Sequence, residues 1–571
     1  MQTKDALSKA RIWIDQLVGK ELQYITGRNT SVINKVDWDD EGKIFISRGE
    51  GKVTIRFERI AAVISKLIKG QPVHVDTVLR SGSNDRSVIE TIVASFPPVG
   101  FMHPGQGRNK SKNKVIQWLS EDIHPLGVIK DISPDEFSAL VVGAAEIQNA
   151  QFLSKPFLLL AGISGTGKTR FVREQAKTSG QFSETYCLTS VRPDWHEPSD
   201  LLGYVSRLNG AAEYITTDVL HFIAKAWRAI ADSGLTVEVQ ESEDQGKRLV
   251  VAGERDALEQ VLPYWLCLDE MNLAPVEQYF ADYLSVLETR EWCWTDDSFT
   301  YSSDALLKPA TIKEVANKEK LRKELGFDNS ENANYDELWQ LICQYGLGIP
   351  FNLLVAGTVN MDETTHGFSR KVIDRALSFD FGAFFPNDYD DFFTPTSCNR
   401  RLSYPIWSHA SKADLANTFD ADGAKTVAFL SAVNTVLKNT PFELAFRALN
   451  ELLLAVASCQ PQDDLTLKAV WDDFMMCKVL PRIEGDTDKL TTSEGKALFA
   501  ELKAVLADKL APMWQAEQGA NNQRPDLYRE KIVADGATDE EKVLPIPCRS
   551  KAKLEWMSDR LASATFTSFW P

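Results

Sequence analysis

The sequence lacks the features that would place this chain in a membrane or outside the cell. No uninterrupted apolar run in its 571 residues approaches the roughly 20 residues that a membrane-spanning helix needs. Residues Met1–Ser8 contain no apolar segment of the kind found in a secretory signal. The eight cysteines include no Cys-x-x-Cys pair, so neither a zinc site nor a disulfide framework is indicated. These absences predict a cytoplasmic protein with no membrane partner, whose cysteines are reduced and buried.

Basic residues are outnumbered by acidic ones. The chain has 63 basic and 80 acidic residues, a net charge of −17. Residues 1–150 carry 20 basic and 18 acidic residues, whereas the remainder carries 43 and 62. A chain this acidic is not expected to coat nucleic acid along its length, and its N-terminal part is the least repulsive place for DNA.

The most informative segment is a glycine-rich turn between an apolar strand and the start of a helix. Residues 162–169 fit the P-loop pattern G-x-x-x-x-G-K-[ST]. The backbone N–H groups of such a turn surround a phosphate at a helix N-terminus, where the helix dipole favours an anion. Lys168 is expected to reach the β- and γ-phosphates, and the Thr169 hydroxyl to hold Mg²⁺. The predicted nucleotide-binding residues are Gly162, Ile163, Ser164, Gly165, Thr166, Gly167, Lys168, Thr169 and Arg170.

A second apolar strand, at 263–269, ends in two acids, as in a Walker B motif. Asp269 would hold Mg²⁺ through water, and Glu270 would orient and deprotonate the attacking water. An apolar run followed by Asp-Glu is weak evidence alone, because many buried strands end in acids. Its position after a P-loop makes it a strong prediction of a nucleoside-triphosphate hydrolase.

Two further polar residues follow this pattern. Asn360 ends the strand at 352–359, which should lie between the other two strands, so its amide is expected to contact the attacking water or the γ-phosphate; a buried Asn capping a turn is the alternative. Arg375 is a candidate arginine finger for the γ-phosphate of a neighbouring subunit, with Arg370 and Lys371 as competitors. An ordinary salt bridge is the alternative for Arg375.

The alternation of strands and helices predicts the α/β class with a parallel P-loop sheet and a helical lid, preceded by a small α/β domain that resembles a winged helix. Expected strands are 156–162, 184–190, 263–269, 352–359 and 377–382. Expected domains are an N-terminal recognition or adaptor domain at 1–130, the NTPase domain at 131–390, and a helical lid with a C-terminal extension at 391–571.

The N-terminal region is predicted to begin with a helix over 4–20 and a β-hairpin around residues 48–51. Residues 74–80 and 85–95 resemble a helix-turn-helix, followed by a wing-like loop at 101–115. This loop contains four cations and no acid: Arg108, Lys110, Lys112 and Lys114. A basic, glycine-rich loop can grip DNA phosphates, but a solvated surface loop has the same composition.

These motifs together resemble the McrB-like and dynein-related branch of the AAA+ NTPases. The resemblance covers roughly residues 150–390 and also involves the stretches 191–204, 268–288 and 357–375. It implies a ring, usually a hexamer, that hydrolyses ATP or GTP at subunit interfaces, with Arg375 acting in trans. It further implies a motor that translocates or remodels DNA for a separate McrC-like nuclease in defence against foreign DNA.

The resemblance leaves several roles open. Restriction GTPases of this family have an M-N-x-x-D stretch, whereas here Val359-Asn360-Met361-Asp362-Glu363 departs from it, so the choice between ATP and GTP stays open. Arg482 and Arg549 are both candidates for a second sensor in the lid. Trp195 and His196 either face the ring pore or pack within the subunit. A MoxR- or dynein-like ATPase that remodels protein complexes, with no direct DNA role, is the alternative function.

Overall fold

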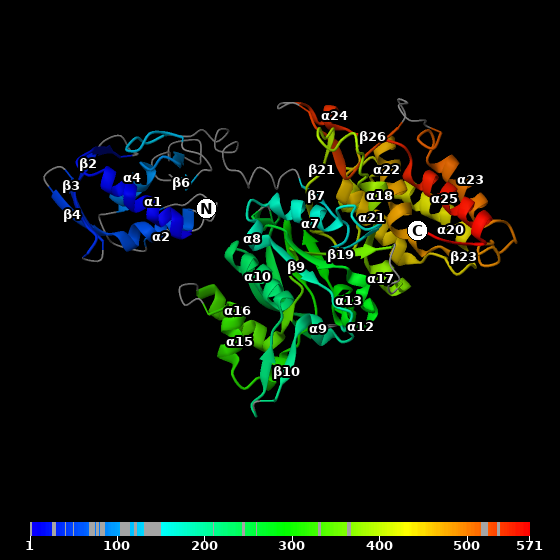
Figure 1. Ribbon diagram of the computed structural model, residues 1–571, viewed down its shortest axis with the longest axis horizontal. Coiled ribbons are helices and arrows are strands. Elements are labelled where there is room, and N and C mark those ends of the chain that lie inside the picture. The colour runs from blue at the N-terminus through cyan, green and yellow to red at the C-terminus, as the bar shows by residue number, and fades with distance from the viewer. Residues whose placement is uncertain are drawn as a thin grey trace. The chain divides into compact units, whose positions relative to one another are not determined.

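The chain forms two compact units, Met1–Gln148 and Asn149–Pro571, each of which is described separately (Figure 1). The computed structural model describes residues 3–24, 30–39, 42–48, 51–67, 75, 79, 86–102, 115–118, 123–130, 150–208, 210–242, 246–258, 260–328, 333–361, 367–515, 523–533 and 537–570.

The N-terminal unit is built on an antiparallel four-stranded sheet in the order β1-β2-β3-β4. Apolar side chains of the sheet and the helices share one core, which includes Ile14, Ile46 and Val93. A separate antiparallel pair, β5–β6, flanks the sequence of the basic loop. The elements are α1 (Thr3–Gln16), β1 (Glu21–Gln23), β2 (Thr30–Asp37), β3 (Lys43–Arg48), β4 (Gly51–Arg56), α2 (Phe57–Leu67), α4 (Arg86–Ala94), β5 (Val99–Met102) and β6 (Val115–Trp118).

The predicted hairpin at 48–51 is present as β3–β4, but the first helix is shorter than expected. It ends at Gln16 because Gly19 adopts a positive φ of 80°, and its N–H donates to Ile33 O at 2.8 Å, which turns the chain into the sheet. The basic loop with Arg108, Lys110, Lys112 and Lys114 lies outside the described residues, as does most of the first helix of the expected helix-turn-helix.

The second unit contains a parallel five-stranded sheet in the order β20-β8-β19-β14-β9, which confirms the α/β class. Each strand falls within a residue or two of its predicted bounds, and the strand ending at Asn360 does lie between the other two motif-bearing strands. Every residue of β8 and β19 is buried, as expected for a sheet with both faces covered. The strands are β8 (Phe157–Gly162), β9 (Tyr186–Ser190), β14 (Tyr264–Asp269), β19 (Leu353–Asn360) and β20 (Leu377–Asp380).

Helices surround the parallel sheet (Figure 1), and the same unit contains a second, antiparallel sheet in the order β12-β13-β16-β15. That sheet was not predicted, because its strands come from two separated stretches of the chain. Its strands are β12 (Thr236–Ser242), β13 (Gly246–Glu254), β15 (Glu291–Thr295) and β16 (Ser298–Ser302). The surrounding helices include α7 (Lys168–Lys177), α10 (Asp218–Asp232), α13 (Ala281–Leu287), α16 (Ala333–Tyr345), α17 (Arg370–Arg375) and α18 (Phe381–Phe384).

The C-terminal part is mainly helical, as predicted, and appears yellow to red in Figure 1. It shares one continuous core with the parallel sheet, so the boundary expected at 390/391 falls inside the second unit. Strand β7 (Gln151–Phe152), just before β8, pairs with β22 (Leu402–Ser403). The main helices are α20 (Ala424–Leu437), α21 (Phe446–Cys459), α22 (Asp464–Phe474) with the π-turn η2 (Met475–Val479), α23 (Leu498–Lys509) and α25 (Arg549–Ala564).

All eight cysteines are free thiols, but they are not all buried as expected. Cys267, Cys477 and Cys548 are buried, whereas Cys293 and Cys398 are exposed. None of the helices in the described part of the chain is both long enough and apolar enough to cross a bilayer.

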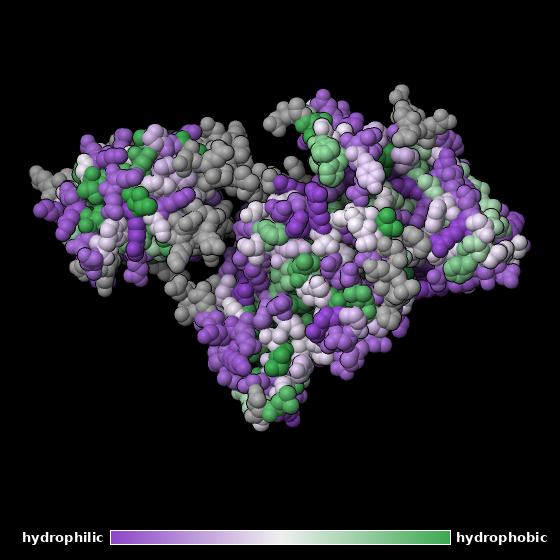
Figure 2. All heavy atoms as spheres, in the orientation of Figure 1, coloured by the Kyte–Doolittle hydropathy of each residue, from purple (hydrophilic) through white to green (hydrophobic). Residues whose placement is uncertain are grey.

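The surface of the second unit mixes polar and apolar side chains (Figure 2). Apolar side chains gather at its lower end in this view, where Figure 1 labels β10 (Tyr204–Ser206). Strand β10 pairs with β11 (Glu213–Ile215). Another exposed apolar group, Tyr389, Phe392 and Phe393, belongs to the segment after α18.

Candidate active site

The predicted motif residues converge at one edge of the parallel sheet. The strands β8, β19 and β14 are neighbours and run parallel, so their carboxyl ends meet. The P-loop leaves β8 there, Asn360 ends β19, and Asp269 ends β14. Ligands of open α/β sheets bind outside the carboxyl ends of the strands, which makes this edge the candidate active site.

The predicted P-loop, the turn at 162–169, has the backbone shape that its glycines allow. Gly165 and Gly167 have φ values of 81° and 89°, in the left-handed region that residues with a side chain rarely adopt. Helix α7 begins at Lys168, whose side chain is buried and whose Nζ donates to the carbonyls of Gly162 at 3.0 Å and Ile163 at 2.8 Å. The ammonium group therefore lies within the loop, while Arg170 is exposed on the helix.

Oxygen ligands for a divalent cation lie directly beside the loop. The Thr169 hydroxyl donates to Asp269 Oδ1 at 2.7 Å, and the Thr358 hydroxyl donates to the same oxygen at 2.7 Å. Mg²⁺ prefers oxygen ligands and is commonly bound by one or two protein groups together with phosphates and water. Thr169 and Asp269 fit such an ion. No group of three or more His, Cys, Asp and Glu suited to a metal occurs among the described residues.

Glu270 is held in an unusual conformation. Its φ and ψ are 52° and 50°, a left-handed backbone that costs energy for a residue with a side chain and is often found at functional sites. Its N–H donates to Thr358 Oγ1 at 2.9 Å, and its Oε1 accepts a bond of 3.3 Å from Asn360 Nδ2. Asn272 Nδ2 in turn donates to Asn360 O at 3.2 Å. The structure thus brings Glu270 and Asn360 together, and Asn360 contacts a carboxylate rather than capping a turn.

Thr358 is a site residue that the sequence reasoning missed. Its hydroxyl joins the two acids, because it donates to Asp269 and accepts from the Glu270 backbone. Thr358 lies two residues before Asn360 on β19, so both side chains are on the same face of the strand. That spacing was a signal that could have identified it.

Arg375 lies at the opposite edge of the sheet from the P-loop. It ends α17, just before β20, and its guanidinium forms an ion pair with Glu288 at 3.4 Å. The adjacent Asp374 carbonyl accepts a hydrogen bond from Lys155, which precedes β8. A strand of this length spans about 20 Å, so Arg375 cannot reach the P-loop of its own chain. Arg370 donates to Pro441 O at 2.8 Å and stacks over Phe442.

The two candidates for a second sensor occupy different places. Arg482 pairs with Asp374 at 3.2 Å, and therefore lies at the edge away from the P-loop. Arg549 begins α25 and donates to Ala383 O in α18, which follows β20 at the P-loop edge. Arg549 is buried, and it pairs with Asp473 at 2.8 Å and Asp526 at 2.9 Å. The structure thus separates the two arginines, and places Arg549 in a buried ionic network of the C-terminal part.

Trp195 packs inside the subunit. Its side chain is buried and forms an edge-to-face contact with Tyr279, with ring centroids 5.3 Å apart. The next residue, His196, is exposed, and hydrogen bonding of its ring to the Asp194 carbonyl raises the pKa of its imidazole. Of the two residues considered for a pore loop, only His196 is accessible.

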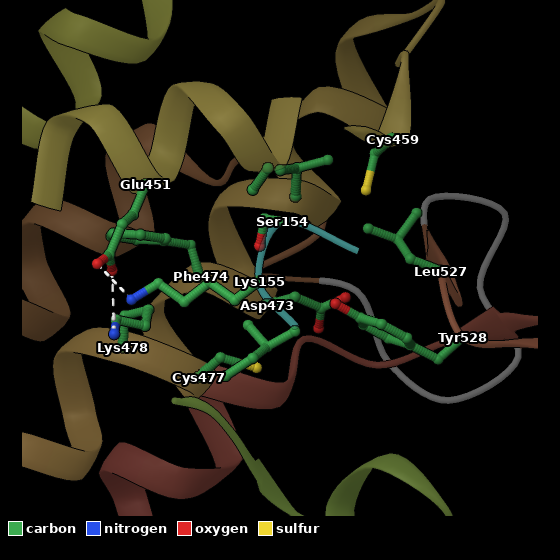
Figure 3. A pocket seen from close by; sticks show the side chains of 13 residues that line it. Ser154, Lys155, Glu451, Cys459, Asp473, Phe474, Cys477, Lys478, Leu527 and Tyr528 are labelled. Atoms are coloured by element: carbon green, nitrogen blue, oxygen red, sulfur yellow. Dashed lines mark hydrogen bonds and ion pairs between the residues drawn. The ribbon is translucent and has the colours of Figure 1, made fainter. Parts of the chain in front are cut away.

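A buried ionic cluster lies at the far edge of the sheet (Figure 3). Glu451 of α21 contacts Lys155 and forms an ion pair of 3.0 Å with Lys478. Lys478 also donates to the carbonyls of Ile373, Asp374 and Ala376 at the end of α17. Burial, and then the neighbouring Lys478, lowers the pKa of Lys155 to about 7. The cluster ties the start of the P-loop strand and the helix of Arg375 to the C-terminal helices.

Comparisons with known proteins give two partial matches. A family model described as a domain of unknown function (DUF8727) matches residues 407–566, within the helical C-terminal part. The type II restriction enzyme NmeDI of Neisseria meningitidis serogroup C is 32% identical over 120 residues, which cover 20% of this chain and 34% of that enzyme. The chain thus spans about a third of the length of this relative.

Proposed function

We propose that the chain is an NTPase of the AAA+ type, which hydrolyses ATP or GTP with Mg²⁺. The observation that carries the proposal is the set of contacts at the carboxyl ends of three adjacent strands: Thr169 with Asp269, and Asn360 with Glu270. These contacts bring a P-loop, a cation site and a candidate general base together. The strand order, with the Asn360 strand between the other two, supports the assignment to this type.

In this proposal the chain's own residues bind the triphosphate and orient water. Lys168 and the P-loop N–H groups hold the phosphates, and bound Mg²⁺ would neutralise charge that develops on the phosphate oxygens. The amide of Asn360 positions Glu270, whose carboxylate takes a proton from the attacking water. Thr358 keeps Asp269 and Glu270 in register with each other.

The proposed enzyme is a homo-oligomeric ring, usually a hexamer in the family it resembles. Arg375 lies too far from its own P-loop to act in cis, but it sits at the sheet edge that a second copy could approach. A guanidinium supplied in trans stabilises charge in the phosphoryl-transfer transition state. In the single chain Arg375 forms an ion pair with Glu288, so this ion pair must break before Arg375 can contact a triphosphate bound to a neighbouring subunit.

We further propose that hydrolysis drives DNA translocation or remodelling for a McrC-like nuclease in defence against foreign DNA. The partial likeness to a restriction enzyme favours this setting. A nuclease centre within the chain itself has less support. The sequence of Asp539–Lys542 fits the D/E-x-K pattern of nuclease centres, but it forms a short exposed helix in which Lys542 pairs with Asp539. Remodelling of protein complexes by a MoxR- or dynein-like ATPase, without a direct DNA role, is the alternative.

The test is hydrolysis of ATP and GTP by the purified chain, with and without DNA and the product of the adjacent gene. Glu270→Gln should lower kcat by at least about 10²-fold, because a positioned base contributes 10²–10⁴-fold, while nucleotide binding is retained. Glu174→Gln, at a partly exposed position on α7, is the matched control and should leave kcat unchanged. A Glu270→Gln variant with normal turnover would refute the assignment. Stimulation by DNA separates the DNA motor from the alternative.

A further inference from the structure

The segment after α18 is acidic and exposes three aromatic side chains. We call residues 388–393 (Asp-Tyr-Asp-Asp-Phe-Phe) the acidic–aromatic segment. Tyr389, Phe392 and Phe393 are 92%, 75% and 91% exposed. Contiguous exposed aromatic side chains in a soluble protein commonly mark an interaction site. The segment follows Asn387, whose side chain donates to the Thr166 carbonyl of the P-loop at 3.1 Å, so it lies at the nucleotide edge of the sheet.

A pocket of complementary character lies at the other edge of the sheet. We call it the basic pocket; its volume is about 590 Å³, within the usual range of ligand pockets, roughly 300–1,000 Å³. Its walls carry four basic residues and two carboxylates: Lys155, Arg290, Arg375, Arg447, Glu288 and Glu451. Both carboxylates are already paired, since Glu288 contacts Arg375 and Arg447, and Glu451 contacts Lys155.

The basic pocket also has an apolar wall. Leu449, Leu453 and Trp407 line it, and Phe446 at its rim is 89% exposed. Among the described residues, Arg290 Nη2 is buried without a hydrogen-bond partner. A ligand suited to this pocket would therefore combine negative charge with aromatic groups.

We propose that the acidic–aromatic segment of one copy docks into the basic pocket of a second copy. In its own chain the segment starts at the opposite end of the sheet from the pocket, because Asn387 contacts the P-loop at one end of β8 while Lys155 and Pro156 of the pocket lie at the other, about 20 Å away. Contact between two different surfaces of identical chains is head-to-tail, and it closes into a ring when the rotation allows.

The inference rests on the proposed function in one respect: it identifies the interface through which Arg375 approaches a neighbour's triphosphate. Docking would place the P-loop edge of one copy against the pocket that contains Arg375 in the next. It would also bring aspartates close to Arg447, which offers Arg447 a partner other than Glu288. The assembly contact is nevertheless separate from the chemistry, so the two can fail independently.

A charge-swap experiment tests the contact with the full chain. Asp390→Lys and Arg447→Glu should each weaken assembly at least about tenfold in sedimentation velocity with ATP or GTP and Mg²⁺, because like charges then face each other at every interface. An equal mixture of the two variants should assemble again, since each altered segment meets an altered pocket and each native segment a native one. Asp539→Lys, an equal charge change on an exposed helix, is the control and should assemble normally.

Phe446→Ala tests the apolar half of the contact without altering charge, and should also weaken assembly. The proposal is overturned if the wild type stays monomeric, if Asp390→Lys and Phe446→Ala assemble like the wild type, or if the mixed variants remain apart. Binding of a fluorescent nucleotide to each variant is measured separately. Assembly without nucleotide binding would refute the NTPase proposal alone, whereas binding and turnover without this contact would refute the docking proposal alone.

Discussion

Replacing Arg549 distinguishes a structural arginine from a nucleotide sensor. Its side chain is 5% exposed and forms ion pairs with Asp473 and Asp526. Its guanidinium also lies 4.2 Å from the ring centroid of Phe384. If these contacts account for its presence, Arg549→Met should destabilise the protein when no nucleotide is bound.

The expected loss follows from the partners left behind. Removing one member of a buried ion pair costs about 3–5 kcal/mol. Asp473 keeps Arg524 at 2.6 Å, and Asp526 keeps Arg529 at 2.9 Å, so the lower figure of about 3 kcal/mol applies. Unfolding gains about 2.1 cal/mol/K per residue, so in a cooperative unit as long as Asn149–Pro571 each kcal/mol shifts Tm by about 1 °C, which predicts a fall of about 3 °C.

The pH dependence supplies an independent check on the same variant. Burial alone would raise the pKa of Asp526, but Arg549 and then Arg529 hold it below its usual value. A carboxyl with a lowered folded-state pKa adds stability above its unfolded pKa, and this stability is lost as the pH falls through the folded pKa. The difference in Tm between wild type and Arg549→Met should therefore narrow as the pH is lowered from about 5 towards 3.

Differential scanning fluorimetry without nucleotide is the assay, with Arg482→Met as the matched control. Arg482 is partly exposed, and within the described part of the chain its one ion pair is with Asp374. Replacing it should therefore lower the free energy of unfolding by at most about 1 kcal/mol. An Arg549→Met protein that melts like the wild type, yet binds nucleotide weakly, would show that the structural reasoning is wrong and that Arg549 is a sensor.

Substitutions at three further residues address the far edge of the sheet and the acids. Glu451→Gln should lower the free energy of unfolding by about 3–5 kcal/mol, because two buried lysines would face each other. Lys155→Met should lower the free energy of unfolding much less. Because the pKa of Lys155 is lowered to about 7, wild-type stability should rise from pH 7 towards 10, and denaturant titrations of Lys155→Met should not show this rise. If the variant still shows it, Lys155 is not its source. Thr358→Val should reduce kcat about 10–100-fold with nucleotide affinity retained, and Thr358→Ser should restore it; equal kcat values for both would remove Thr358 from the site.

The sequence predicted the parallel sheet well because its strands are short apolar runs next to recognisable turns. The predicted P-loop marks the carboxyl end of β8, and Asp269 marks that of β14. The sequence therefore located these two ends without any knowledge of which strands pair with them. The position of the Asn360 strand between them was inferred from the P-loop pattern and is confirmed. Hydrophobic periodicity and local turn signals were sufficient for this part of the fold.

Contacts between residues far apart in the sequence could not be predicted from local patterns. Glu288 pairs with Arg447, 159 positions away, and nothing local in either stretch indicates this partner. The second sheet joins β13 to β16 across the whole of β14 and α13, so its pairing depends on tertiary packing. The left-handed conformation of Glu270 likewise depends on Thr358, Asn360 and the surrounding backbone. The motifs pointed to residues that meet in the structure, Thr169 with Asp269 and Glu270 with Asn360, but their supporting contacts could not be predicted.

If the proposed function and docking contact hold, a single strand, β8, connects the nucleotide site to the assembly contact. The end of β8 carries Lys168 and the start of α7, while its beginning follows Lys155, which contacts the end of the Arg375 helix. Lys155 and Lys478 bind the carbonyl of Asp374 and share Glu451 of α21, so a shift of the C-terminal helices must move the backbone next to Arg375. Nucleotide at one end of β8 and a neighbouring copy at the other would thus act on one packed body. Loosening the Glu451 cluster should therefore reduce turnover of assembled protein more than nucleotide binding by single chains.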